Sequence, residues 1–381
     1  MQSIRTEPDS DSLLLGEETL SMDSQTRGFV RLRTTSLTRH VQILGTTGSG
    51  KSQTSKVLAC EIAKQKIPIT ILDRTGEYVE VLPSLIRGTR VLTPGENLSI
   101  AIFERGATDD LPAHIEDRLS LLNRFYRVTY EEDLSPLQGR ILRKVLFDHY
   151  VHSKSNLSVY ELILQLDQFE KGCKDLHGWP ESIEAMISML WPLTVSKVGA
   201  TFNRLYSDFN ATELFDPGLT IIDLSVLPDD SARNLLSQVV LKEVYGEARK
   251  RGKRNGEVSL VFVIDEAHHI CPNQRGYISI PERCAIELRK YGFALVTCAT
   301  RPALVSPNII ANSNTLICHM LNNIDDTGTA AGFFVGGKQF SDSLRRLPVG
   351  EALVQINAPV PKNVIRCRVG TAEQRGTPGI A

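Results

Sequence analysis

The sequence predicts an α/β fold built on a mostly parallel sheet, with a helical subdomain inserted into it. Short apolar runs bounded by Gly, Pro or Asp recur along the chain and are apolar on both faces, which is typical of strands covered by helices on both sides. Amphipathic stretches with helical spacing lie between many of these runs. The alternation of strand and helix patterns indicates an α/β domain.

The elements of the sheet are expected in chain order at seven apolar runs. These runs are Val41–Leu44, Ile69–Leu72, Leu219–Ile222, Leu260–Ile264, Ala294–Cys298, Thr315–Cys318 and Ala352–Ile356. One helix between them is indicated by apolar residues with a spacing of three and four, at Leu236, Val239, Val240 and Val244.

The expected domain organisation has four parts. Residues 1–28 are rich in Ser, Asp, Glu and Thr and predict a flexible N-terminal arm. Residues 29–105 form the first part of the core, and residues 216–381 form its second part with the C-terminal strands. Residues 106–215 predict the helical insertion, because they contain few strand patterns and carry helical stripes.

Composition excludes several classes of protein. With 381 residues and 41% hydrophobic content, the chain is neither disordered nor collagen-like. Its 43 Lys and Arg residues nearly balance 44 Asp and Glu residues, so an anionic partner must be held by local basic patches such as residues 249–254, which also end a helix. The seven scattered cysteines predict buried thiols in a reducing cytoplasm. No apolar run reaches the roughly 20 residues that span a bilayer, so we expect a cytoplasmic protein without a membrane partner.

The most specific motif is a glycine-rich loop between a predicted strand and a predicted helix. It consists of Gly45, Thr46, Thr47, Gly48, Ser49, Gly50, Lys51 and Ser52, followed by Gln53. Backbone N–H groups of such a loop surround phosphate oxygens, the Lys51 ammonium reaches the β- and γ-phosphates, and the Ser52 hydroxyl binds Mg²⁺. The motif therefore predicts a P-loop fold of the RecA/FtsK-like type that binds ATP and Mg²⁺.

Acidic and polar residues follow two other predicted strands. Asp265 and Glu266 end the run Leu260–Ile264, where Asp265 is expected to hold Mg²⁺ and Glu266 to polarise the attacking water. Thr300 and Arg301 follow the run Ala294–Cys298 and are candidates to sense and bond the γ-phosphate. An alternative for Arg301 is an ion pair with a carboxylate at the end of its strand.

These residues resemble the HerA/FtsK superfamily of ring-forming translocases, and most closely its HerA branch. The resemblance covers residues 36–368 and rests on ordered stretches around the P-loop. The other stretches are residues 71–78, 265–268, 288–292, 300–302, 322–326 and 347–352. It implies a homo-hexamer with ATP between subunits and duplex DNA in a central channel.

The resemblance also implies roles for two arginines. Arg39, twelve residues before Lys51, matches an arginine that acts on the nucleotide of its own subunit. Arg289 matches the arginine finger supplied to a neighbouring site, the alternative being an arginine at a helix end. The family usually has Gln where this chain has Thr300. About 40 residues precede the P-loop, so we expect the N-terminal β-barrel of HerA proteins, which helps to organise the nuclease NurA, to be absent.

The function predicted from these observations is a Mg²⁺-dependent, ATP-hydrolysing hexameric DNA translocase or helicase. It is expected to work with a nuclease or another effector enzyme in DNA end processing or antiviral defence. A ring-shaped scaffold or regulatory ATPase that assembles and activates a partner is one alternative, and a DNA-packaging or conjugative pump is another.

Overall fold

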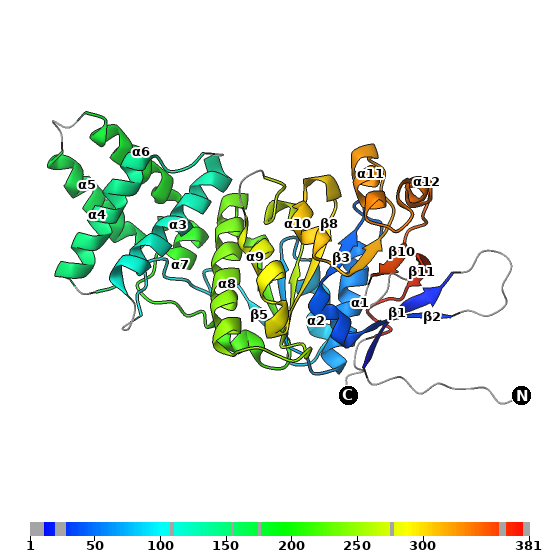
Figure 1. The fold of residues 1–381 in the computed structure, drawn as a ribbon. Coiled ribbons are helices and arrows are strands. Elements are labelled where there is room, and N and C mark those ends of the chain that lie inside the picture. Colours follow the sequence, from blue (N-terminus) through cyan, green and yellow to red (C-terminus); the bar gives the residue numbers. More distant parts are fainter. Residues whose placement is uncertain are drawn as a thin grey trace, which may run out of the picture. The chain divides into compact units, whose positions relative to one another are not determined.

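The computed structural model describes residues 11–19, 28–106, 110–130, 132–153, 155–173, 177–274, 278–357 and 363–375. These residues divide into two compact units. The first unit consists of residues 1–91, 211–223 and 240–381, and it contains the sheet (Figure 1). The second consists of residues 92–210 and 224–239 and is helical.

The sheet of the described residues has eleven strands in the order β2-β1-β11-β10-β9-β3-β8-β7-β4-β6-β5. The central strands from β9 to β6 pair in parallel, whereas β10, β11, β1 and β2 continue the sheet in antiparallel fashion. The strands are β1 Ser12–Glu18, β2 Phe29–Arg33, β3 Val41–Leu44, β4 Ile69–Asp73, β5 Arg90–Leu92, β6 Leu219–Asp223, β7 Leu260–Ile264, β8 Phe293–Ala299, β9 Thr315–Cys318, β10 Glu351–Ile356 and β11 Ile365–Val369. The predicted α/β fold with a mostly parallel sheet is confirmed.

All seven predicted strands are present, with ends that differ by one residue or none. Their central residues are buried because helices of the first unit cover the sheet on both faces. The prediction of a flexible arm is wrong for residues 12–18, which form β1 and pair with β2 and β11. The remainder of that arm lies largely outside the described residues. Leu13 and Leu15 of β1 are fully buried in the core, which explains why this segment is ordered.

The longer helices of the first unit are α1 Lys51–Lys64, α2 Glu77–Leu85, α9 Ile280–Glu287, α10 Pro307–Ala311, α11 Ile324–Gly332 and α12 Ser341–Arg345. Those of the second unit are α3 Leu111–Tyr130, α4 Pro136–His152, α5 Val159–Lys171, α6 Trp179–Leu190 and α7 Ser196–Phe202. Helix α8 Asp230–Lys250 begins in the second unit and ends in the first. Serine side chains cap α4, α5 and α9 through capping boxes, which satisfy N–H groups of the first turn.

The helical unit differs from the predicted insertion at its boundaries. It includes residues 92–105 and the first half of α8, and it ends at residue 210 and not at 215. The N–H of Ile100 donates to the Thr201 carbonyl at 2.8 Å, which attaches the start of the unit to α7. Leu235 of α8 shares a small cavity with Leu121 of α3, so the first half of α8 packs within the helical unit.

The seven cysteines are all buried as free thiols, as predicted. In the part of the chain that the structure describes, we find no helix whose length and apolar character together suffice for a membrane span.

Candidate nucleotide-binding site

The glycine-rich loop has the predicted setting, since it joins the buried strand β3 to α1, whose first residue is Lys51. Gly48 and Gly50 have φ angles of 75° and 113°, which other residues adopt only at a cost. The Lys51 side chain is buried, and its Nζ donates to the Thr46 carbonyl at 3.2 Å. Ser49 Oγ donates to the same carbonyl at 2.7 Å. The ammonium is therefore held against the loop where phosphate groups would lie.

His319, directly after β9, supports this loop and was not singled out in the sequence. Its ring is fully buried, with Nε2 2.7 Å from Thr54 Oγ1 on α1 and Nδ1 2.9 Å from the Glu351 carbonyl. A Cβ added to Gly45 would lie 2.5 Å from Ser49 Oγ and 2.7 Å from the Cβ of His319, so these two residues leave space only for glycine there. The sequence signal that could have identified His319 is its position as a polar residue directly after the apolar strand β9.

The acidic strand end lies where it was predicted. Asp265 follows β7 and is 4% exposed, and Thr75 Oγ1 donates to its Oδ2 at 3.1 Å. Burial, followed by the nearby carboxylates of Glu266 and Asp73, raises the pKa of Asp265 to about 7. Asp73 accepts three N–H bonds at the start of α2, so its oxygens stabilise a turn. A cation beside Asp265 would offset the unfavourable charge of this carboxylate group.

The donor chemistry of this site fits Mg²⁺. The carboxylate of Asp265 and the hydroxyl of Ser52, on the first turn of α1, are hard oxygen ligands of the kind that Mg²⁺ prefers. No group of three or more His, Cys, Asp or Glu side chains suited to a metal occurs among the described residues. Phosphate oxygens and water would supply the other ligands, which is common for this ion.

Glu266 lies next to Asp265 in the left-handed region, with a φ of 46°. Its Oε2 accepts hydrogen bonds from the Thr300 hydroxyl at 2.8 Å and from the Thr300 N–H at 3.3 Å. His268 Nδ1 lies 3.3 Å from the same oxygen. Burial, with the charge of His269 as a second cause, lowers the pKa of His268 to about 4, so this ring is neutral at pH 7.

Arg301 forms the ion pair that was the alternative to a phosphate contact. Its Nε donates to Asp326 Oδ2 at 2.9 Å, and Asp326 Oδ1 accepts the N–H of Ala303 at 3.0 Å. The Arg301 side chain is 49% exposed, whereas that of Asp326 is 2% exposed. The segment after β8 is thus fastened to α11.

Arg39 and Arg289 lie at the other edge of the sheet from the P-loop. Arg39 ends the 3-10 helix η1 Thr34–Arg39 just before β3, and Arg289 begins the 3-10 helix η6 Arg289–Tyr291 before β8. Because β3 and β8 are parallel, residues that precede both strands share one edge and the P-loop lies at the opposite edge. This separation does not favour the expectation that Arg39 contacts the nucleotide of its own subunit, which stays a prediction.

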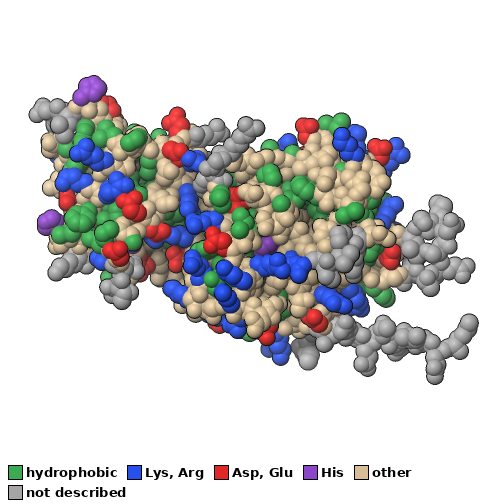
Figure 2. Space-filling model, in the orientation of Figure 1, with side chains coloured by type: hydrophobic (Ala, Val, Ile, Leu, Met, Phe, Trp, Pro, Cys, Tyr) green, Lys and Arg blue, Asp and Glu red, His purple; other side chains and the backbone are tan. Residues whose placement is uncertain are grey.

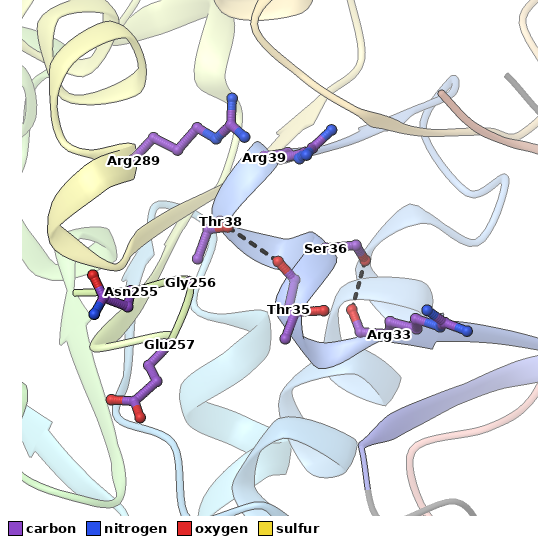
Figure 3. A pocket seen from close by; sticks show the side chains of 9 residues that line it. All are labelled: Arg33, Thr35, Ser36, Thr38, Arg39, Asn255, Gly256, Glu257 and Arg289. Carbon is purple, nitrogen blue, oxygen red and sulfur yellow. Dashed lines mark hydrogen bonds between the residues drawn. The ribbon is translucent and has the colours of Figure 1, made fainter. Parts of the chain in front are cut away.

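The two arginines share a cavity of about 380 Å³ with Arg33, the last residue of β2. Figure 3 shows Arg39 and Arg289 on the same side of this cavity, with Arg33 set apart from them. Within the described residues, none of the three guanidinium groups forms a hydrogen bond or an ion pair with a side chain, although Glu257 also lines the cavity. Three unpaired cations around one cavity favour an anionic ligand.

A basic surface adjoins this cavity. Figure 2 shows Lys and Arg side chains gathered where α8 ends and α9 lies. The exposed residues there include Arg249, Lys250, Lys253, Arg254 and Lys290. The predicted helix end within residues 249–254 is confirmed, since α8 ends at Lys250.

A P-loop at the end of a parallel strand, with two acidic residues that follow another parallel strand at the same edge of the sheet, defines the fold of P-loop nucleoside triphosphatases. The chain belongs to the family described as "Helicase HerA, central domain", whose model matches residues 19–244, more than half of the sequence. It is 26% identical over 341 residues to a DNA double-strand break repair helicase HerA of Sulfurisphaera tokodaii. It is also 26% identical over 355 residues to a probable repair helicase HerA of Methanocaldococcus jannaschii.

These matches cover most of this chain but less of the relatives. They include 85% of this chain and 64% of the Sulfurisphaera protein, and 84% of this chain and 69% of the Methanocaldococcus protein. The chain thus spans about two thirds of the length of these curated relatives.

Two solved structures share the fold. VirB4 of Thermoanaerobacter pseudethanolicus has a TM-score of 0.68 at 16% identity, covering 95% of this chain and 97% of that one. The plasmid coupling protein TrwB in complex with ADP and Mg²⁺ has a TM-score of 0.62 at 15% identity, covering 90% and 87% of the two chains.

Proposed function

We propose that this protein is a Mg²⁺-dependent ATPase that assembles as a hexameric ring and moves along or unwinds duplex DNA. The observation that carries the ring is the separation of the P-loop from Arg39 and Arg289 at opposite edges of one sheet. Arg39 and Arg289 of one subunit therefore do not lie beside the P-loop site of that same subunit. A neighbour packed head to tail would supply Arg39 and Arg289 to it.

Each residue of the site has a role under this proposal. The loop N–H groups and Lys51 bind the phosphates of ATP, while Ser52 and Asp265 hold Mg²⁺, which neutralises charge that develops on the transferred phosphoryl group. Glu266 accepts a proton from the attacking water. Arg39 and Arg289 of the adjacent subunit stabilise the transition state, so Arg39 acts in trans and on turnover.

DNA as the substrate is supported by the names of the relatives and by the exposed basic surface at the end of α8. Cationic side chains from six copies would act together on a polyanion even though each copy has a net charge of −1. A nuclease or other effector partner, in end processing or antiviral defence, is part of the same proposal and rests on the family membership. We place the protein in the cytoplasm, where such a substrate is present.

The test combines particle mass with ATP turnover. We expect a hexamer in the presence of ATP and a turnover rate that rises at least several-fold with saturating duplex DNA. A verified hexamer whose rate ignores DNA would contradict the motor and favour the scaffold or regulatory ATPase. Lys51→Ala is expected to abolish turnover, and Glu266→Gln to bind ATP without hydrolysing it.

Mixed rings test the action in trans. Arg289→Ala subunits keep an intact P-loop, and Lys51→Ala subunits keep an intact arginine. Each variant alone should be inactive, whereas mixtures should regain turnover at interfaces that combine the two intact parts. Full activity of Arg289→Ala on its own would exclude the finger role.

A further inference from the structure

The carboxylate of Glu266 accepts two hydrogen bonds from Thr300. Thr300 donates both its hydroxyl, at 2.8 Å, and its N–H, at 3.3 Å, to Oε2 of Glu266. The backbone of Glu266 has φ 46° and ψ 53°, a conformation that costs a non-glycine residue roughly 1–2 kcal/mol. Strain of this kind persists where the surrounding contacts require it. The two bonds from Thr300 hold the side chain of this strained residue.

The order of the strands places Thr300 between the P-loop and Glu266. Strand β8, which leads into Thr300, lies between β3, which leads into the P-loop, and β7, which leads into Glu266. The N–H of Gly45 donates to the carbonyl of Ala299, the residue before Thr300, at 3.3 Å. Thr300 therefore sits between the P-loop and Glu266, and its bonds draw the carboxylate toward the loop.

The hydrogen-bond donors of Thr300 are fully used by Glu266. A threonine hydroxyl carries one proton, and the residue has one backbone N–H. Both are donated to Oε2, so Thr300 has no donor left for a phosphate oxygen while this arrangement lasts. The geometry does not suit the role of γ-phosphate sensor that was expected from the sequence.

The segment that carries Thr300 is also fixed from the other side. Arg301 and the N–H of Ala303 both bond to the buried Asp326 on α11. This anchor leaves the Thr300 side chain in one place, which is what orienting another side chain requires.

We propose that Thr300 is a positioning residue that orients the Glu266 carboxylate toward the attacking water. In this role it acts through Glu266 and makes no contact with the nucleotide. The proposal rests on the proposed function, because it takes Glu266 as the group that accepts the proton from water.

The experiment compares Thr300→Val, which keeps the shape of the side chain and removes the hydroxyl, with Thr300→Ser, which keeps the hydroxyl. In the full-length ring with saturating DNA, we expect Thr300→Val to lower kcat about 10- to 100-fold, less than the roughly 10²- to 10⁴-fold contribution of a general base, because Glu266 remains but loses one orienting bond. KM for ATP and the affinity for the fluorescent analogue mant-ATP should change less than twofold. Thr300→Ser should restore at least half of the lost rate.

A double variant separates the two roles of Thr300. If it acts only through Glu266, Thr300→Val in a Glu266→Gln background should cause no further loss of the residual rate. A further loss, or a weakened affinity for mant-ATP relative to mant-ADP, would overturn the proposal, because both indicate contact with the γ-phosphate. Thr300→Ala is the second variant should the valine disturb folding, and the same outcomes apply to it.

The result for Glu266→Gln alone distinguishes the two proposals. Rapid turnover by this single variant would contradict the proposed function of Glu266. Slow turnover by Glu266→Gln together with an unchanged rate for Thr300→Val would leave the function standing and refute the positioning role.

Discussion

His40 makes the stability of the sheet edge that carries Arg39 and Arg289, called here the arginine edge, dependent on pH. The residue lies between Arg39 and β3, is 1% exposed and has both ring nitrogens bonded. Nδ1 accepts the N–H of Leu295 at 3.0 Å, so Nε2 carries the proton and donates to the Ala285 carbonyl at 2.8 Å. Protonation of Nδ1 would place its N–H opposite the N–H of Leu295, so two donors would face each other and the hydrogen bond to β8 would be lost.

The size of the effect follows from the pKa. Burial, and to a smaller extent the positive charge of Arg289, lowers the pKa of His40 from 6.5 to about 4, although the bond to Ala285 opposes this. In the unfolded chain, His40 therefore gains a proton below pH 6.5, whereas in the folded protein it stays neutral until about pH 4. The contribution to the free energy of unfolding is complete above pH 6.5. Relative to pH 7.5, about 2 kcal/mol is lost at pH 5 and about 3 kcal/mol at pH 4.

Urea denaturation at several pH values measures this loss. His40→Gln removes the titrating group, so the stability of the variant should fall about 2 kcal/mol less than that of the wild type between pH 7.5 and pH 5. His268 and His319, whose pKa values burial also lowers to about 4, remain in both proteins and cancel in the comparison. Replacement of the exposed His152 by Gln is the control and should leave the curve unchanged. Parallel curves for wild type and His40→Gln would refute the reasoning.

Three other outcomes are expected. Arg39→Ala should lower ring turnover at least tenfold and leave mant-ATP binding unchanged, because the subunit's own P-loop lies at the opposite edge, and mixing with Lys51→Ala protein should restore activity. His319→Ala should weaken mant-ATP binding and lower the unfolding free energy by roughly 2–4 kcal/mol, since it opens a cavity and leaves Thr54 without its partner. Ser279→Ala should cost about 1 kcal/mol in urea denaturation through loss of the α9 cap.

The central sheet was predictable because its pattern is local. Strands β3 and β7 are buried on both faces, so all their residues except Gln42 are apolar and the run stands out from its surroundings. Strands β2 and β11 were missed since they carry arginines at alternate positions and lie in the antiparallel part of the sheet. Their pairing depends on partners far away in the sequence, which no local pattern contains.

The sequence was enough to predict which residues form the candidate site, but not which hydrogen bonds they make with one another. The P-loop and the acidic strand end follow strands that the sequence displays, and parallel strands bring them to one edge. The placement of Arg39 could have been inferred as well, because it precedes the strand that the P-loop follows. The bonds from Thr300 to Glu266 depend on β8 lying between β3 and β7. That strand order was not available from the residues.

The direction of the parallel strands explains why this protein would work as a ring. Groups that follow the strands, such as Lys51 and Glu266, bind and activate, whereas Arg39 and Arg289 precede strands and face outward from the other edge. A side chain is too short to reach from one end of these strands to the other. The arginines and the P-loop residues therefore meet only when the arginine edge of one subunit packs against the P-loop edge of the next. His40 bonds the arginine edge to β8, whose far end carries Thr300. Under the proposed function, contact with a neighbour and orientation of the base are therefore linked through one strand, β8.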